Sequence, residues 1–131
     1  MRNILLFIVA ALLLVAMPAE AKKTKGAKIE FATKVHDFGF VQESKGNVSY
    51  GFEFKNVGNA PLIIVNASAS CGCTKPEYPR NPIKPGQTGV IKVTFRTKHQ
   101  SGPFEKSVTV KTNNQIERIR IKGNVIPAAI K

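Results

Sequence analysis

Apolar and polar residues alternate along most of the chain, most clearly around Phe52. Val48, Tyr50, Phe52 and Phe54 are separated by single small or charged residues, so a strand here places all four side chains on one face. This period of two is typical of a half-buried β-strand, and we expect Phe52, Phe54 and Phe95 to lie in the core. The same spacing predicts further strands at residues 29–31, 35–41, 61–69, 91–95, 108–110 and 119–125.

The segment from residue 61 to residue 89 is less regular. Residues 61–69 form a more uniformly apolar run, whose alternation places Ile63, Val65 and Ala67 on one face. Residues 70–89 contain four prolines and three glycines, which interrupt regular pairing. We therefore expect 70–89 to be mostly loop.

About seven short strands separated by turn signals, with no sustained helical period, indicate an all-β domain. The predicted fold is an immunoglobulin-like antiparallel β-sandwich, in which two sheets bury alternate residues against each other. A small β-barrel is the alternative. The chain has no Trp and its two cysteines are neighbours, so the antibody arrangement of Cys, Trp and Cys is absent and the sandwich belongs to another lineage.

The amino-terminal residues 1–21 predict a cleavable secretory signal. Arg2 supplies a positive charge, residues 4–17 are continuously apolar, and Ala19-Glu20-Ala21 has the small-x-small pattern that signal peptidase requires. An uncleaved anchor is the alternative, although the run is shorter than the ~20 residues of a spanning helix. We expect export to the periplasm, cell surface or medium, with no transmembrane span after cleavage. The remaining chain divides into a flexible basic leader at 22–28, the sandwich domain at 29–127 and a tail at 128–131.

The charge balance is strongly basic. The formal net charge is +12, and the signal removes one base and one acid, so the exported part keeps all of it. Such a charge attracts anionic partners. Export argues against a specific nucleic-acid target and favours an anionic surface polymer or another envelope protein. A solvated basic surface with no specific partner is the alternative, because the basic residues are scattered.

Several short motifs occur in a fixed order along the chain. They are Asp37-Phe38-Gly39, Asn56-x-Gly58-x-x-Pro61-Leu62, Cys71-Gly72-Cys73-Thr74, Ile83-x-Pro85-Gly86, Gly102-x-Phe104 and Thr112-Asn113. Together they resemble an uncharacterised family of exported bacterial domains, related to Hydin-like and major-sperm-protein domains. The resemblance runs from Phe31 to about Val125. It implies an Ig-like fold and an exported, often surface-associated setting, and it implies no established activity.

Cys71 and Cys73 are the most unusual feature of the sequence. Two residues apart in a strand, their Cα atoms would be roughly 6.6 Å apart. That separation is close to the upper limit for a disulfide, about 6.8 Å, although Gly72 permits a bend. A disulfide that closes so small a loop stabilises the fold little, so a purely structural disulfide is a poor explanation for the pair. Three hypotheses remain: a redox-active pair, two ligands for Cu(I) or for Zn²⁺ with His36 or His99 added, or small buried apolar residues.

The cysteines border a proline-rich segment. Thr74, Tyr78 and Arg80 form a candidate binding loop there, and the alternative is a stiff loop with no partner.

Catalysis finds little support in the sequence. The only histidines are His36 and His99, the acidic residues are scattered singly, and no hydrolase elbow, zinc-protease helix or phosphate-binding glycine loop occurs. We therefore expect a non-catalytic binding or assembly module at the cell envelope, and no enzyme. The competing hypothesis is a thiol redox or Cu(I)-binding protein that uses Cys71 and Cys73. No other cofactor is expected.

Overall fold

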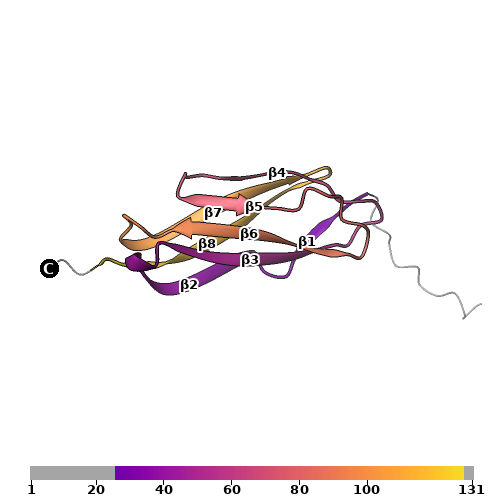
Figure 1. Ribbon diagram of the computed structural model, residues 1–131. Helices are drawn as coiled ribbons and strands as arrows, with labels where there is room; N and C mark the ends of the chain where they lie inside the picture. Colours follow the sequence, from indigo (N-terminus) through magenta and orange to yellow (C-terminus); the bar gives the residue numbers. More distant parts are fainter. Residues whose placement is uncertain (1–25, 129–131) are drawn as a thin grey trace, which may run out of the picture.

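Within residues 26–128, which the computed structural model describes, eight strands form two four-stranded sheets packed face to face (Figure 1). A single turn of 3-10 helix, η1 (Glu43–Lys45), joins the second and third strands. The strands are β1 (Ile29–Phe31), β2 (Val35–Gln42), β3 (Asn47–Asn56), β4 (Ile64–Ala69), β5 (Thr74–Glu77), β6 (Thr88–Arg96), β7 (Gly102–Thr112) and β8 (Ile116–Ile126).

The order of the strands confirms the predicted all-β, immunoglobulin-like sandwich. Sheet A has the order β1-β3-β6-β5, and sheet B has the order β2-β8-β7-β4. Every neighbouring pair is antiparallel except β2 and β8, which run parallel. The expectation of two wholly antiparallel sheets is therefore wrong at this pairing. Alternation specifies which face of a strand is buried, but not which distant strand it joins.

The predicted core lies between the two sheets. Phe52, Phe54 and Phe95 are at most 1% exposed, so their placement in the core is confirmed. Phe31 packs edge-on against Phe54, with ring centroids 6.0 Å apart. Burying such large side chains is the main favourable term in the stability of a domain this size. The other buried apolar residues of β6, β7 and β8 are Ile91, Val93, Val108, Val110, Ile119, Ile121 and Val125.

The prediction that Ile63, Val65 and Ala67 share one face is wrong. Ile63 and Val65 are 41% and 52% exposed, whereas Ile64 is buried. Ala67 is buried as well, on the side opposite to Ile63 and Val65, because the register of β4 against β7 shifts between Ile64 and Asn66. An extra residue in a strand reverses the side on which the following side chains point. The alternation of residues 61–69 therefore changes phase in the middle of the run.

Residues 70–89 are mostly loop, as predicted, but they also contain the short strand β5. β5 pairs antiparallel with β6, from Thr74 opposite Phe95 to Glu77 opposite Lys92. It includes Pro76, which has no N–H to donate. Proline is tolerated there because β5 is an edge strand of sheet A.

The ordered domain begins before residue 29. Ala27 is 2% exposed, the Gly26 N–H donates to Asn59 Oδ1 at 2.7 Å, and the Lys28 carbonyl accepts from the Val57 N–H at 2.8 Å. The last three residues of the predicted flexible leader are thus part of the sandwich. The predicted signal at 1–21, the rest of the leader and residues 129–131 of the predicted tail lie outside the described residues. Among residues 26–128, no helix is long and apolar enough to cross a membrane.

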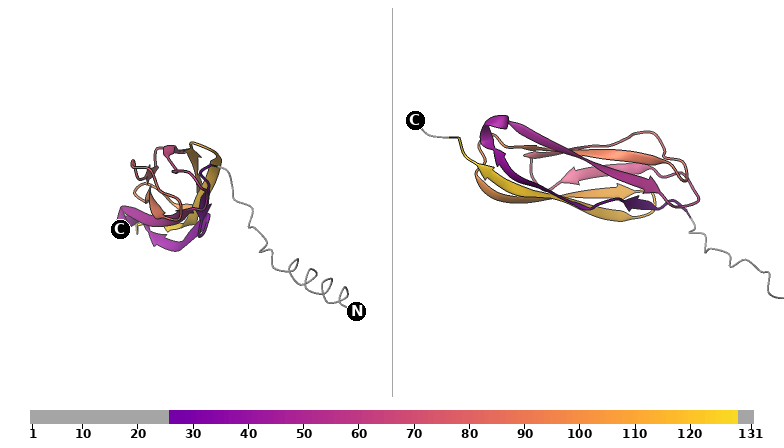
Figure 2. Two further views of the ribbon diagram at one scale, coloured as in Figure 1. Left: turned by 90° about the vertical axis from the view of Figure 1, so that its right-hand side faces the viewer. Right: turned by 90° about the horizontal axis from the view of Figure 1, so that it is seen from below.

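The sandwich is elongated, and its strands run close to its long axis (Figure 2). The described chain enters next to β1 at one end and leaves after β8 at the other end, beside η1 (Figures 1 and 2). At the exit, the Ala128 N–H donates to Glu43 Oε1 at 3.0 Å.

One buried polar side chain, Asn56, holds three segments together. Its Oδ1 accepts from the Lys28 N–H at 3.3 Å and the Gly58 N–H at 3.0 Å. Its Nδ2 donates to the carbonyls of Ala60 and Ile83, at 2.8 and 2.9 Å. A Cβ on Gly58 would lie 2.1 Å from the Gly26 carbonyl oxygen, so only glycine fits where the entering chain crosses this turn. These motif residues have a structural role.

Candidate functional site

The Cys71-Gly72-Cys73 turn carries the chain from sheet B to sheet A, between β4 and β5. The two cysteines form a disulfide, with Cα atoms 5.4 Å apart. Gly72 is exposed, and a Cβ added to it would have no heavy atom within 4 Å. The turn is therefore open to solvent at Gly72, and a partner could approach it there.

The two sulfurs have different surroundings. Cys71 is half-buried, whereas Cys73 is 7% exposed and belongs to the core. The Cys73 carbonyl accepts from the Arg96 N–H at 2.8 Å, which fixes the turn to β6. The Cys73 Sγ lies 3.8 Å from the Thr74 Oγ1. An incoming group can therefore reach Cys71 more easily than Cys73.

The three residues of the predicted binding loop are not equally available. Thr74 is 5% exposed, so it cannot serve as a surface contact. Tyr78 is half-buried against the core, and the guanidinium of Arg80 lies over its ring, 4.5 Å from the centroid. This cation–π contact leaves Arg80 as the exposed member of the group.

The structure gives no support for a zinc site. His36 stacks on Tyr50 with ring centroids 3.7 Å apart, and it makes a T-shaped contact with the ring of Phe38, with centroids 4.7 Å apart. His99 lies in a turn with φ 66°, and its N–H donates to Glu43 Oε2 at 2.9 Å. No group of three or more His, Cys, Asp and Glu side chains that could hold a metal is found within residues 26–128. Within the described residues, neither histidine therefore forms a metal-binding group with the two cysteines.

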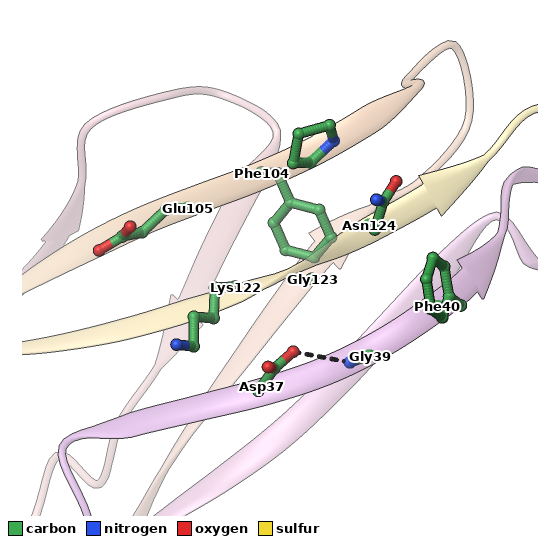
Figure 3. Close-up of a pocket in the computed structure, with 9 residues that line it drawn as sticks. Asp37, Gly39, Phe40, Phe104, Glu105, Lys122, Gly123 and Asn124 are labelled. Atoms are coloured by element: carbon green, nitrogen blue, oxygen red, sulfur yellow. Dashed lines mark hydrogen bonds between the residues drawn. The ribbon is translucent and has the colours of Figure 1, made fainter.

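A second candidate site, which the sequence analysis missed, is an open groove of about 500 Å³ at one end of sheet B. It crosses three strands, with Asp37 and Phe40 on β2, Lys122 on β8 and Glu105 on β7 (Figure 3). Phe40 is 76% exposed, the largest exposed fraction among the large apolar residues described. The full lining is Asp37, Gly39, Phe40, Pro103, Phe104, Glu105, Lys122, Gly123 and Asn124.

A β-bulge in β2 produces the groove. The register of β2 against β8 shifts between Asp37 and Phe40, and Gly39 has φ 67°. The Asp37 Oδ1 accepts from the Gly39 N–H at 2.8 Å, which holds the bulge in shape (Figure 3). As a result Phe40 points outward while the adjacent Val41 is buried. The sequence does hold a signal for this bulge. Asp37 precedes Gly39 by two residues, and Phe40 and Val41 then follow as two adjacent apolar residues that break the alternation.

The floor of the groove is continuous with the core. Phe104 stacks on the buried Phe95, with ring centroids 4.0 Å apart and planes 16° apart. A Cβ on Gly123 would lie 2.9 Å from the Phe104 ring and 3.0 Å from the Gly39 carbonyl oxygen. The glycine therefore lets the ring and the bulge approach each other. Because the floor is packed against the core, the shape of the groove is set before any ligand arrives.

The rim of the groove carries charges of both signs. Lys122 lies directly opposite Asp37 on β2 and Glu105 on β7 in the strand register. Glu105 also forms an ion pair with Arg120 at 3.7 Å. The groove thus combines one exposed aromatic ring with carboxylates, an ammonium group and the Asn124 amide, which suits a partner with both apolar and polar groups.

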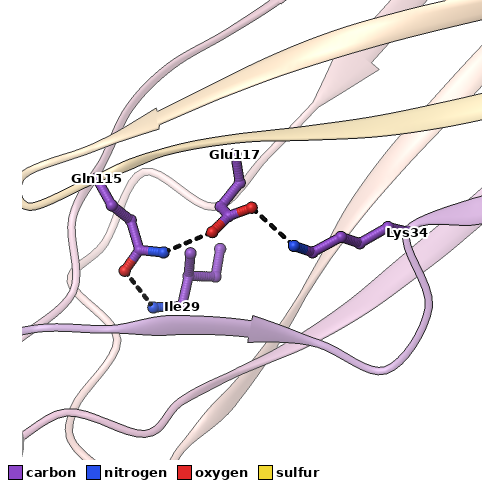
Figure 4. A network of polar contacts seen from close by, with 4 residues as sticks. All are labelled: Ile29, Lys34, Gln115 and Glu117. Atoms are coloured by element: carbon purple, nitrogen blue, oxygen red, sulfur yellow. Dashed lines mark hydrogen bonds and ion pairs between the residues drawn. The ribbon is translucent and has the colours of Figure 1, made fainter.

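The acidic groups with clearly shifted pKa values lie away from both sites. Lys34, whose Nζ donates to Glu117 Oε2 at 2.8 Å, lowers the pKa of Glu117 below its usual 4.5 (Figure 4). Gln115 Nε2 donates to the other carboxylate oxygen at 2.8 Å, and Gln115 Oε1 accepts from the Ile29 N–H at 3.3 Å. This network joins the start of β8 to β1 and to the segment before β2.

Glu43 has a lowered pKa for a different reason. The backbone N–H groups of Ala128 and then His99 donate to its carboxylate and favour the charged form. The carboxylate fixes the chain where it leaves β8. Both shifted carboxylates therefore hold segments of the fold in place.

Comparisons with solved structures agree with the sandwich fold. A protein of unknown function from Porphyromonas gingivalis W83 aligns with a TM-score of 0.64 and 18% identity, covering 83% of this chain and 51% of that one. The Vibrio cholerae VesB protease aligns with a TM-score of 0.57 and 13% identity, covering 75% of this chain and 31% of that one. The chain thus spans about half or less of these neighbours, and such low identities establish the fold alone.

The comparisons by sequence point to one family. No curated protein matches the chain. The family described as "Protein of unknown function (DUF1573)" matches residues 29–125, which is most of the sequence. The chain therefore belongs to this family of unknown function.

Proposed function

We propose that the protein is an exported, non-catalytic binding or assembly module of the cell envelope that works through the groove beside Phe40. One observation carries this proposal: a preformed groove of about 500 Å³ with a 76% exposed phenylalanine at its edge. Aromatic rings that anchor a partner bury a large apolar area with few rotatable bonds. Export rests on residues 1–21, and the kinship to Hydin-like and major-sperm-protein domains rests on the ordered motifs.

The exposed ring of Phe40 does not belong to the core of the domain. The ring points away from the core, so it adds little to the stability of the isolated sandwich. The bulge that turns it outward is held by the Asp37–Gly39 hydrogen bond and by the positive φ of Gly39. A partner that covers the ring removes its apolar surface from water, which favours association.

The groove favours another envelope protein as its partner. Lys122, Asp37 and Glu105 alternate in sign across the three strands, and the aromatic ring lies beside them. Charges of mixed sign fix the register of a protein partner, and the apolar centre supplies most of the affinity.

Replacing Phe40 with Ser tests the groove. The mature protein is immobilised, incubated with an envelope extract of its native host, and the captured proteins are measured by quantitative mass spectrometry. We expect F40S to lose a defined subset of the proteins that the wild type captures. The matched control is V90S, which changes a 50% exposed apolar residue on sheet A.

Both variants should keep their stability within about 0.5 kcal/mol, since both side chains are exposed. An unchanged set of captured proteins with F40S would contradict the proposed role of the groove. Loss with V90S as well would indicate adhesion to exposed apolar surface in general.

Thiol–disulfide exchange at Cys71 and Cys73 is the second candidate function, favoured by the unequal exposure of the two bonded sulfurs. A thiolate of an exported dithiol protein attacks the Cys71 Sγ, the S–S bond breaks, and Cys73 leaves as a thiolate. The second thiol of the partner then attacks the mixed disulfide and releases Cys71. Two electrons and two protons pass to this protein, and the partner gains a disulfide. The reduced pair offers two sulfur ligands that suit Cu(I).

Alkylation of the partly reduced protein tests this chemistry. In folded protein treated with a mild dithiol, we expect Cys71 to be labelled faster than Cys73, because Cys73 is buried and only an accessible thiolate reacts. Peptide mapping by mass spectrometry measures both rates, and labelling in urea provides the unfolded reference. If both cysteines were labelled only at the rate of global unfolding, the exchange and copper hypotheses would fail and the pair would be structural.

A further inference from the structure

We propose that the outer face of sheet B binds a linear anionic polysaccharide through a basic stripe formed by Lys111, Arg118 and Arg120. All three residues are exposed, and they occupy adjacent positions on β7 and β8. The stripe lies beside the Phe40 groove and does not include any residue that lines it.

Alternation along β8 directs the two arginines outward. Ile119 and Ile121 are at most 1% exposed and point into the core, so Arg118 and Arg120 extend from the opposite face. Their Cα atoms are separated by about 6.6 Å along the strand. Lys111 lies opposite Ile116 on the neighbouring strand, diagonally across from Arg118. The three cationic side chains are thus aligned on a solvent-exposed surface.

The neighbours of the stripe are mostly uncharged hydrogen-bonding groups. Thr109 is directly opposite Arg118, and Ser107 is directly opposite Arg120. On the next strand, Ser68 pairs with Thr109 and Asn66 pairs with Lys111. Ser68 and Asn66 are exposed. Hydroxyl and amide groups beside cations suit a ligand that carries both acidic groups and many hydroxyls, and an acidic polysaccharide has both.

The acidic residues of this face do not neutralise the stripe. Asp37 and Glu105 gather at the groove end, opposite Lys122. Glu105 lies 3.7 Å from Arg120, but both side chains are more than half exposed, so this surface ion pair is weak. Glu117 faces Lys34 and Gln115 instead.

The outer face of sheet A provides a contrast. There, Lys55 is directly opposite Glu30, and Lys92 is directly opposite Glu77. Lys75 also approaches Glu77, at 3.9 Å. Carboxylates thus alternate with most of the bases of sheet A, whereas Lys111 and Arg118 have Ile116 and Thr109 opposite them. Lys111, Arg118 and Arg120 therefore form a run of bases with no carboxylate directly opposite them, which is complementary to a polyanion.

Substitution of the stripe tests the inference. The triple variant K111Q/R118Q/R120Q is compared with K55Q/K92Q/R96Q, which removes the same charge from the exposed face of sheet A. The probes are polygalacturonate and dextran sulfate, with neutral dextran as the uncharged reference, and calorimetry gives the affinities. We expect the stripe variant to bind both anionic probes at least about tenfold more weakly than the sheet A variant does, because each protein cation that is removed no longer displaces a counterion from the polyanion, and each such loss weakens binding severalfold.

Salt dependence provides an independent measurement. Three ionic contacts should weaken wild-type binding roughly thirtyfold between about 50 and about 200 mM salt, by counterion release. The stripe variant should lose most of that dependence, and the sheet A variant should keep it. Thermal unfolding confirms that both variants are folded, as expected for exposed substitutions.

Three outcomes would overturn the inference. Equal weakening in both triple variants would mean that net charge alone attracts the polymer. Equal binding of neutral dextran would exclude an electrostatic site. Loss of polymer binding in F40S would place the polymer in the groove. Conversely, unchanged polymer binding in F40S supports the stripe as the polymer site. The polymer proposal for the stripe and the protein-partner proposal for the groove can therefore fail separately.

Discussion

Asn56 shows how a single polar residue can determine the fold locally. Its side chain is fully buried and makes four hydrogen bonds, to the entering strand, to its own turn and to the segment before β6. Its backbone N–H and carbonyl also pair with Gln87 and Gly86. A side chain of another length could not reach all of these groups, and buried polar groups left unpaired are costly.

We expect N56A to destabilise the domain by roughly 2–4 kcal/mol, because it leaves several buried backbone groups without partners. Urea denaturation measures the change in the free energy of unfolding. N113A is the control: Asn113 also makes two side-chain hydrogen bonds, to Ile63 and Pro61, but it is exposed. Water can replace them, so the loss should be about 1 kcal/mol or less. Equal losses of stability in N56A and N113A would mean that the burial of Asn56 adds nothing to the stabilising effect of its hydrogen bonds.

Among the strands, those with unbroken alternation could be predicted from the sequence. In β3, β6 and β8 the alternate apolar residues are buried or partly buried, because no residue is inserted and one face of each strand meets the other sheet. In β2 and β4 the register shifts, so the faces exchange within the strand. The groove depends on the bulge in β2, for which the sequence holds only a short signal at Asp37–Val41, and on the contact of Gly123 with Phe104, which joins two strands and leaves no local signal.

The cysteine turn shows a second limit of the sequence. The spacing of Cys71 and Cys73 identified the candidate site, but the burial of Thr74 and Cys73 depends on β5 joining β6. The proline content of 70–89 argued against that strand, and only its edge position in the sheet permits it.

The Glu117 network connects elements of both sheets, and its strength should depend on pH. The pKa of Glu117 is lower in the folded protein than its ordinary 4.5, chiefly because of the hydrogen bond from Lys34. A lowered folded-state pKa means that its stabilisation is fully present above the unfolded pKa and disappears as pH falls through the folded pKa. E117Q should therefore be less stable than wild type near neutral pH, and the difference should shrink below about pH 4.5.

Urea denaturation of both proteins at several pH values measures this difference. Repeating the series in about 1 M salt is the control, because screening weakens an exposed ion pair. A difference that does not change with pH would show that the Glu117 carboxylate acts through packing and not through its charge.

At the scale of the whole molecule, the two sheets present different outer faces. Sheet A carries alternating charges, whereas sheet B carries the basic stripe and, at its end, the Phe40 groove. A sandwich fold is shared by proteins with unrelated activities, including the VesB protease, so the fold does not specify a function. The basic stripe and the Phe40 groove, which distinguish the outer face of sheet B from that of sheet A, are the features that can specify a function.

The parallel pairing of β2 with β8 also determines how the domain would respond to a pulling force. The described chain begins beside β1 at one end of the sandwich and ends after β8 at the other end, and β2 and β8 run in the same direction (Figure 1). A pull on the two ends would slide these strands past each other, from Val35 opposite Arg120 to Gln42 opposite Ile126. The hydrogen bonds between them would then be loaded together in shear, and would have to break together instead of opening one after another.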